Sequence, residues 1–306
     1  MIQSNRQKTI IIQNNITNYS LTKRKGSLMK SKSITVLLAA LFFTIFQSFI
    51  FAHGGSKNVK LHVMNEKQKD KWDECSFKLD PNLTQKSWHQ FTEEGGLVIY
   101  FRPLKDAKPM GAGNYEFSLM QVETSIDDTD DAWNDTFVHP DSNHWLYEGD
   151  GLTFPGLVFR AGITENFDAG LYWTINPNAN YGYWGGQLQY NFINNIEKNW
   201  AASARIGFVS MFGPKDFDHT VYGLDVLASR EYSIYSDWVS ISPYAGFSAF
   251  LSRTHETTTA VNLKDENVLG GQAMVGLVAN ISMARLAVEY NLAVVNSFNF
   301  KIGVAF

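Results

Sequence analysis

Apolar and polar residues alternate with a period of two at the end of the chain. The last ten residues read S-F-N-F-K-I-G-V-A-F, with apolar side chains at every second position. The positions between them carry serine, asparagine, lysine, glycine and alanine. Alternation of this kind is typical of a β-strand whose two faces lie in different environments. Residues 297–306 therefore predict a strand with one strongly apolar face and one mildly polar face.

Nine earlier segments repeat this alternation. They are residues 115–119, 157–163, 167–175, 184–192, 200–208, 222–228, 239–251, 273–281 and 286–294. Glycine, serine, asparagine and glutamine dominate their polar positions, with a few isolated charges. The polar face of a soluble sandwich would point to water and be rich in lysine and glutamate, so this composition favours an enclosed interior. The pattern predicts about ten strands, and a range of eight to twelve is compatible with it.

The apolar face of these segments has the character of a surface that meets lipid. It is uninterrupted and carries Trp or Tyr near the segment ends, as the outer face of a membrane barrel does. Hydrocarbon cannot hydrogen-bond to the backbone, so strands at that depth must close into a barrel without free edges. The sequence thus predicts an all-β fold, an antiparallel transmembrane β-barrel preceded by a short N-terminal helix.

The lengths of the links between segments give an independent indication. Short links are expected at 164–167, 193–199, 232–237 and 282–285, and the other set is 125–151, 176–180, 213–218, 253–268 and a turn near Asn296. The two longest links, 125–151 and 253–268, both belong to the second set. This parity is typical of barrels with short periplasmic turns and longer external loops.

On these residues the chain resembles bacterial outer-membrane β-barrel proteins of a porin-like kind, over about residues 113–306. In that family a terminal aromatic residue, preceded by apolar residues at alternate positions, is the signal read by the barrel-assembly machinery. The positions that match this signal are Phe298, Phe300, Ile302, Val304 and Phe306. The resemblance implies insertion into outer-membrane lipid with that machinery as a partner. It implies no particular substrate and no characterised subfamily.

Residues 34–52 form the one long apolar run of the chain. Lys30 and Lys32 precede it and Ala52 ends it, which is typical of a secretory signal peptide cleaved near residue 52. The run is also long enough to span a bilayer as a helix, so a retained anchor is the alternative. Met29 is a plausible start of the signal peptide, with residues 1–28 as a mis-assigned extension. Export and the outer membrane are thus the predicted localisation.

Residues 53–112 are interpreted as a periplasmic lead segment before a barrel at 113–306. Asp80 and Pro81 resemble an N-cap and first helical position, and Gly95 stands where a helix would stop, so a helix is expected over 82–94. Residues 97–101, LVIYF, are compatible with a strand, a plug inside the barrel, or a lid on its periplasmic end.

Composition excludes several functional classes. The chain of 306 residues has a net charge of -4 and no basic patch, so nucleic acid is not an expected partner. Its one cysteine, Cys75, excludes an intramolecular disulfide and a cysteine-rich metal site. No cofactor and no metal are expected.

Charged residues at predicted inward positions are the first candidate site. They are Glu116, Arg160, Asp168, Arg205, Asp225, Arg285, Glu289 and Lys301. A ten-stranded barrel is only slightly wider than the eight-stranded kind that side chains nearly fill, so these charges are expected to pair into a structural network. The functional alternative is that they line a narrow polar path and select solutes by charge.

Two further clusters lie on predicted external loops. The link 125–151 carries Asp127, Asp128, Asp130, Asp131, Asp135, Asp141, Glu148 and Asp150, but Ala132 and Val138 break the calcium-loop pattern, which favours a solvated acidic loop. His139, His144 and His255 could serve as bases near these carboxylates, although no specific spacing supports catalysis. His53, if cleavage exposed it, could chelate copper.

Three functions remain open on the sequence. The first is a narrow channel for small polar solutes, which the polar lumen favours. The second is a closed barrel that displays links 125–151 and 253–268 to an external partner. The third, a rim enzyme that uses the three loop histidines, has the weakest support, so the chain is not expected to be an enzyme.

Overall fold

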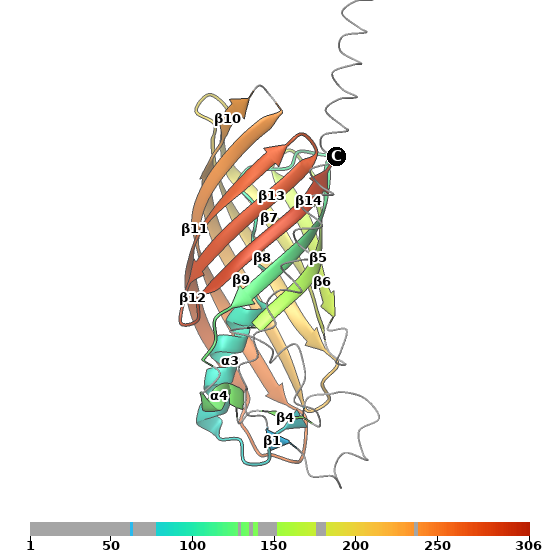
Figure 1. Cartoon of the computed structure of the whole chain (residues 1–306), viewed down its shortest axis with the longest axis vertical. Helices are drawn as coiled ribbons and strands as arrows, with labels where there is room; N and C mark the ends of the chain where they lie inside the picture. The colour runs from blue at the N-terminus through green and yellow to red at the C-terminus, as the bar shows by residue number, and fades with distance from the viewer. Residues whose placement is uncertain are drawn as a thin grey trace, which may run out of the picture. The chain divides into compact units, whose positions relative to one another are not determined.

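The structure, a computed structural model, describes residues 62–63, 78–127, 130–134, 137–139, 152–175, 182–235 and 238–306. Within these ranges ten strands close into one antiparallel barrel, which confirms the predicted fold class (Figure 1). They are β3 (Tyr115–Thr124), β5 (Leu152–Gly162), β6 (Phe167–Ile175), β7 (Gly182–Asn195), β8 (Trp200–Phe212), β9 (Phe217–Arg230), β11 (Val239–Glu256), β12 (Glu266–Ile281), β13 (Ala284–Leu292) and β14 (Ser297–Ala305). The predicted signal peptide at 1–52 lies outside the described residues.

The barrel closes where its last strand meets its first. β14 pairs with β3 from Ser297 opposite Thr124 to Ala305 opposite Glu116. Each of the other barrel strands pairs with the preceding and the following barrel strand in the chain. Phe306 continues this seam, because its backbone N–H and C=O exchange hydrogen bonds with Tyr115. The C-terminal segment is therefore a complete member of the barrel wall.

Period-two alternation determines which side chains face outward. On β11, Phe247 is 72% exposed, whereas the adjacent Ser248 is 7% exposed. On β14, Phe298 is 51% exposed and Asn299 is fully buried at 0%. At these positions the large apolar side chains face outward and the small polar ones face inward, as the sequence predicts.

We refer to the two ends of the barrel by their links. The turn end carries the links β5–β6, β7–β8 and β12–β13, and the loop end carries the links β3–β5 and β11–β12. A short extra strand, β10 (Tyr232–Tyr235), lies at the turn end and pairs with β11, with Tyr232 opposite Ile241. The sequence predicted only a link there.

The inner face of the barrel is divided into an apolar and a charged half. Buried apolar residues line the half toward the loop end, among them Met120, Val122, Tyr172, Tyr183, Val209, Val221 and Phe250. The buried charged residues lie toward the turn end, beside further buried apolar residues such as Leu227, Tyr244 and Val278. The sequence predicted an interior of glycine, serine, asparagine and glutamine and did not predict this apolar half. The apolar half faces a helix whose position the alternation of the strands does not reveal.

That helix is α3 (Gln85–Ile99), which packs against β3, β9, β11 and β12. It contacts a short helix, α4 (Asp131–Asn134), in the β3–β5 link. A small sheet of β1 (His62–Val63), β4 (Phe137–His139) and β2 (Lys78–Leu79) completes the described structure. Among the described residues, no helix has the length and apolar character needed to cross a membrane.

Candidate functional site: the plugged lumen

α3 begins at a side-chain cap and presents its apolar face to the barrel wall. Thr84 is the N-cap, and its Oγ1 accepts a hydrogen bond from the Ser87 N–H at 3.2 Å. Trp88 and Phe91, one turn apart, stack with ring centroids 5.5 Å apart. Both rings also contact Phe217 of β9 edge-on. The helix is thus fixed to the wall by its first two turns.

Two glycines allow the last turns of α3 to approach the wall closely. A Cβ on Gly96 would lie 2.6 Å from the Ser252 side chain, and one on Gly95 would lie 3.0 Å from the His219 ring. The sequence indicated that the helix stops at Gly95, but it continues to Ile99. These glycines are inside the helix because no larger residue fits between it and the wall.

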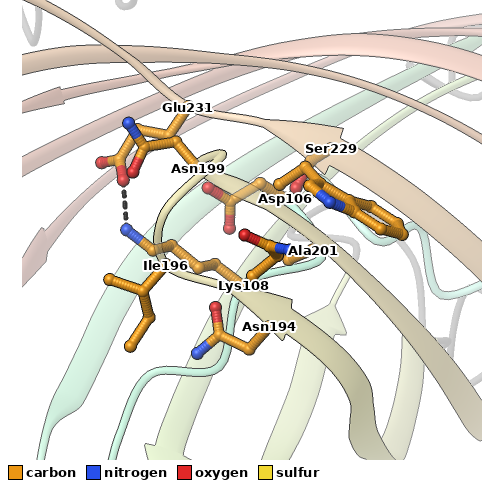
Figure 2. Close-up of a pocket in the computed structure, with 10 residues that line it drawn as sticks. Asp106, Lys108, Asn194, Ile196, Asn199, Ala201, Ser229 and Glu231 are labelled. Carbon is orange, nitrogen blue, oxygen red and sulfur yellow. Dashed lines mark hydrogen bonds and ion pairs between the residues drawn. The ribbon is translucent and has the colours of Figure 1, made fainter.

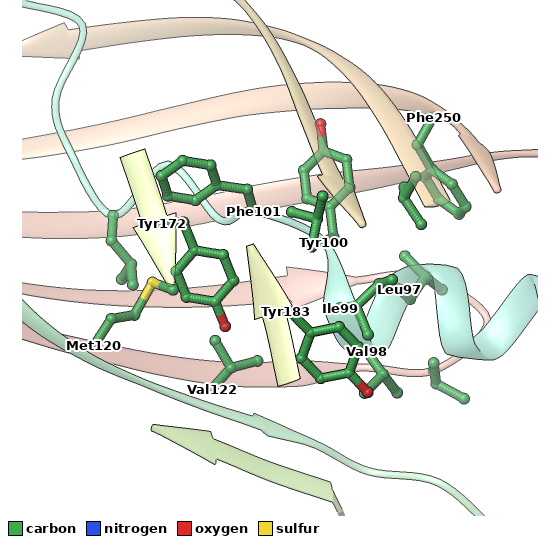
Figure 3. Close-up of a cluster of buried hydrophobic side chains, with 14 of the residues drawn as sticks. Leu97, Val98, Ile99, Tyr100, Phe101, Met120, Val122, Tyr172, Tyr183 and Phe250 are labelled. Carbon is green, nitrogen blue, oxygen red and sulfur yellow. The ribbon is translucent and has the colours of Figure 1, made fainter. Parts of the chain in front are cut away.

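The segment 97–101 is a plug element in the apolar half of the lumen. Leu97, Val98 and Ile99 end α3, and Tyr100 and Phe101 continue into the barrel as extended chain (Figure 3). All five side chains are at most 4% exposed. The Phe101 ring stacks on Tyr172 of β6, with centroids 5.1 Å apart. Of the three alternatives left open by the sequence, the structure shows the plug.

Beyond Phe101 the chain crosses the charged half of the lumen, where wall residues bind its backbone. Arg205 donates from Nη2 to the Phe101 carbonyl oxygen at 2.5 Å. Arg160 donates from Nη2 to the Pro103 carbonyl oxygen at 2.5 Å. The Leu104 N–H donates to Oε2 of Glu289 at 3.1 Å. Three of the predicted luminal charges therefore hold the extended chain in place.

Side chains of the extended segment also bind the wall. The Tyr100 hydroxyl donates to Oδ1 of Asp225 at 2.8 Å. Lys105 forms an ion pair with Asp168 at 3.1 Å, with both side chains at most 8% exposed. Near the turn end, Lys108 pairs with Glu231. The segment 85–112 thus occupies the lumen from one end to the other, and we call it the plug.

The charges of the wall also pair with each other. Oε1 of Glu116 lies 3.2 Å from Nη1 of Arg160 and 2.5 Å from Nζ of Lys301. Arg205 donates from Nε to Oδ2 of Asp225 at 2.6 Å. Burying unpaired charges would be costly, so these contacts stabilise the interior. The eighth predicted residue, Arg285, is less buried and donates to backbone carbonyls of the β12–β13 link.

Buried charges of the plug balance those of the wall. On the wall, the buried anions are Glu116, Asp168, Asp225 and Glu289, and the buried cations are Arg160, Arg205 and Lys301. The extended part of the plug adds the buried residues Arg102, Lys105 and Asp106. Among these described residues the lumen therefore holds five cations and five anions. The plug supplies the positive charge that the wall lacks.

The outer face of the barrel exposes large apolar side chains, as a membrane barrel requires. Of the residues matching the predicted assembly signal, Phe298, Val304 and Phe306 are 51%, 38% and 62% exposed, whereas Phe300 and Ile302 are partly buried. Closed strands with an apolar outer face and a polar or filled interior are what lipid requires. The fold is that of an outer-membrane β-barrel.

Comparisons with known proteins find only weak similarities. No protein-family model matches the sequence, and no curated protein matches it. Similar solved structures include an outer membrane channel from Pseudomonas putida F1, with 10% identity, TM-score 0.39, and coverage of 68% of this chain and 100% of the other. The β domain of the Bordetella autotransporter BrkA has 12% identity, TM-score 0.36, and coverage of 64% and 100%. KdgM porin has 8% identity, TM-score 0.30, and coverage of 62% and 99%. At these values none of them indicates an activity.

The loop histidines of this outer-membrane β-barrel do not form a described catalytic group. His144 lies outside the described residues, and His139 is described only as part of β4. His255 is exposed and its Nδ1 lies 2.7 Å from Oδ1 of Asp265. That hydrogen bond and the Asp265 charge raise the pKa of His255 above its usual value. Among the described residues no cluster of potential metal ligands is present.

A buried histidine and serine pair in the lumen was not singled out from the sequence. Nε2 of His219 lies 2.9 Å from Oγ of Ser252. The Ser252 hydroxyl donates to the Thr92 carbonyl of α3 at 2.6 Å, so the histidine must be the donor in the first contact. Both side chains are buried. The pair therefore binds α3 to the wall, and its geometry does not suit a nucleophile and base.

Proposed function

We propose that the protein is an outer-membrane barrel whose own plug closes the lumen at rest, and that it acts through the surface at its loop end. The observation that carries this proposal is the continuous contact of the plug with the wall. These contacts begin at the loop end, where Thr254 and Ser252 of β11 bind Thr92 of α3, and end at the turn end, where Lys108 pairs with Glu231. A solute would have to displace the plug to pass.

Apolar burial supports a closed resting state. The plug buries Trp88, Phe91, Leu97, Phe101 and Leu104, each at most 5% exposed. Burying each such side chain contributes roughly 1.5–3 kcal/mol, so together they favour the closed state by on the order of 10 kcal/mol. Thermal motion alone would then populate an open lumen very rarely.

The surface at the loop end is formed by α3 of the plug together with the β3–β5 link and the start of β12, and hydrogen bonds join these parts. Nε1 of Trp133 in α4 donates to Glu94 at 2.5 Å, and Gln90 donates to Asp130 at 2.7 Å. His89 lies 2.8 Å from Glu266 at the start of β12. The chain that precedes α3 therefore lies at the loop end, beside the β3–β5 and β11–β12 links, and the plug runs from there to the turn end. This placement replaces the periplasmic lead segment in our proposal.

The charge of this surface indicates the kind of partner it would attract. The link 125–151 contains eight acidic residues and no lysine or arginine. Complementary potentials speed association and disfavour partners of like charge. We therefore expect a partner with a basic surface.

Surface labelling of single-cysteine variants tests the arrangement. In a Cys75→Ser background, Lys86→Cys introduces a thiol at the exposed start of α3, and Lys198→Cys introduces one in the exposed β7–β8 turn. A membrane-impermeant maleimide should label Lys86→Cys on intact cells, but Lys198→Cys only after the outer membrane is permeabilised. Labelling in the opposite sense would contradict the proposal.

Binding of a fluorescent oligolysine peptide to the protein in nanodiscs tests the function of the surface. Replacing the eight acids of 125–151 by their amides should abolish this binding while the barrel stays folded. Glu165→Gln and Glu197→Gln, both at the turn end, are the matched controls and should bind as the wild type does. Equal loss in the controls would show unspecific attraction.

A channel for small polar solutes is the second candidate, because the wall charges pair within the wall. The contacts of Glu116 with Arg160 and Lys301, and of Arg205 with Asp225, would survive removal of the plug. An opened lumen would thus stay lined by satisfied charges. For this candidate to hold, some condition must displace the plug and so raise the conductance of the full chain in a lipid bilayer.

A further inference from the structure

A cavity of about 280 Å³, lined by both polar and apolar side chains, lies at the turn end between the plug and the barrel wall (Figure 2). Asp106 and Lys108 of the plug line it on one side. Asn194, Asn199 and Ser229 of the wall and its β7–β8 turn line it on the other. A cavity of this volume admits a small molecule of a few heavy atoms.

Asp106 is a buried carboxylate that points into this cavity (Figure 2). It is 8% exposed, and it forms no hydrogen bond or ion pair with any residue that the structure describes. The buried carboxylates of the wall are by contrast all bound: Glu116 and Asp225 each pair with a cation, and Glu289 accepts hydrogen bonds from the Tyr244 hydroxyl and the Leu104 N–H. A buried carboxylate without a partner is costly, so a counter-ion from outside the chain would stabilise it.

The cations near Asp106 are bound to other groups. Lys108 is paired with Glu231 at the more exposed part of the cavity, where their side chains are 44% and 22% exposed. Arg285 is within electrostatic range of Asp106, but its guanidinium donates to backbone carbonyls. Neither cation forms an ion pair with Asp106 among the described contacts.

The rest of the lining combines neutral hydrogen-bonding groups with the apolar side chains of Ile196, Trp200 and Ala201. The side-chain amide oxygens of Asn194 and Asn199 and the hydroxyl of Ser229 can accept hydrogen bonds. A ligand that suits this lining donates several hydrogen bonds and carries a positive charge. A metal ion is less well matched, because the described residues contain no cluster of three potential metal ligands.

We propose that this cavity binds the ammonium group of a small primary amine, with the Asp106 carboxylate as its counter-ion. The ammonium has three donors, which can reach Asp106 and two of the neutral acceptors. The proposal is independent of the partner proposed for the loop end, because the cavity lies at the opposite end of the barrel.

Calorimetric titration of the full chain in neutral detergent with ethanolamine tests the site. Asp106→Asn keeps the shape of the side chain and removes its charge, and Ala201→Leu fills the cavity from the wall while Asp106 stays intact. Glu197→Gln, in the exposed β7–β8 turn, is the control. Circular dichroism and heat-dependent gel mobility show whether each variant folds.

Saturable binding by the wild type and the control is expected, with affinity reduced at least about tenfold in both cavity variants. Absence of saturable binding to the wild type would overturn the proposal. Binding of glycerol as tightly as ethanolamine, or equal ethanolamine binding by Asp106→Asn, would overturn it too. Tighter binding of calcium chloride than of ethanolamine, lost in Asp106→Asn, would identify a metal site instead.

Discussion

Replacing Phe101 by alanine should loosen the plug without unfolding the barrel. The Phe101 ring is 3% exposed, stacks on Tyr172 at 5.1 Å, and lies 5.4 Å from the Arg205 guanidinium carbon. Truncating a buried phenylalanine to alanine costs about 3–5 kcal/mol, as lost apolar contact and as a cavity. The cost should fall on the closed state of the plug, because the wall keeps its own hydrogen-bonded ladder.

Hydrogen exchange followed by mass spectrometry measures this effect directly. A loss of about 3 kcal/mol should raise the exchange rate of plug amides near Leu104 by about a hundredfold, since every 1.4 kcal/mol is about a factor of ten. Phe247→Ala, which removes a ring that is 72% exposed on the outer face, should leave plug exchange unchanged. Equal exchange in Phe101→Ala and the wild type would refute the placement of this ring inside the lumen.

Three further predictions concern the contacts that hold the plug and the loop end. Gly96→Leu should prevent α3 from docking, because a Cβ there would meet the wall at 2.6 Å, and proteolysis of the plug in the folded barrel should increase. Lys105→Met should destabilise the folded protein by about 3–5 kcal/mol in urea titrations, because it leaves the buried charge of Asp168 without a cation. The double variant with Asp168→Asn should recover most of that loss, because the amide oxygen can still accept the Met110 N–H. The pKa of His255 in NMR titrations should lie above its usual value and fall in Asp265→Asn; because the pKa is raised in the folded state, the link between these two residues is present at low pH and weakens as pH rises through that pKa.

The barrel could be predicted from the sequence because contact with lipid requires a regular alternation of apolar and polar residues along each strand. Outward positions at the depth of the lipid must be apolar, so the alternation in segments such as 297–306 is regular and long. The length parity of the links is an independent signal, and it agrees with the structure. β10 was missed because four residues in a link carry too little pattern to distinguish a strand from a turn.

The plug could not be placed from the sequence, because an enclosed polar surface suits water and protein equally well. One signal was present. Met120 and Val122 occupy the inward parity of β3, and Tyr172 and Phe250 do the same on β6 and β11. Apolar residues at inward positions on the loop-end half of several strands indicate that an apolar element fills that half.

Both ends of α3 were predicted wrongly from local sequence signals. Asp80 and Pro81 suggested the start, but the N-cap is Thr84. Gly95 suggested the stop, because glycine usually follows a helix, whereas here tertiary packing against Ser252 requires glycine within it. The pairing of the luminal charges with Tyr100 and Phe101 was likewise hidden, because those contacts join residues more than 100 positions apart in the chain.

Conductance in planar lipid bilayers tests the central claim most directly. The chain from residue 53 to residue 306 should insert and give no steady conductance, because residues 85–112 fill the lumen. A variant without residues 53–112, refolded and checked for barrel structure, should form a narrow, steadily conducting pore. A full chain that conducts as steadily as the deletion variant would contradict a lumen closed by its own plug.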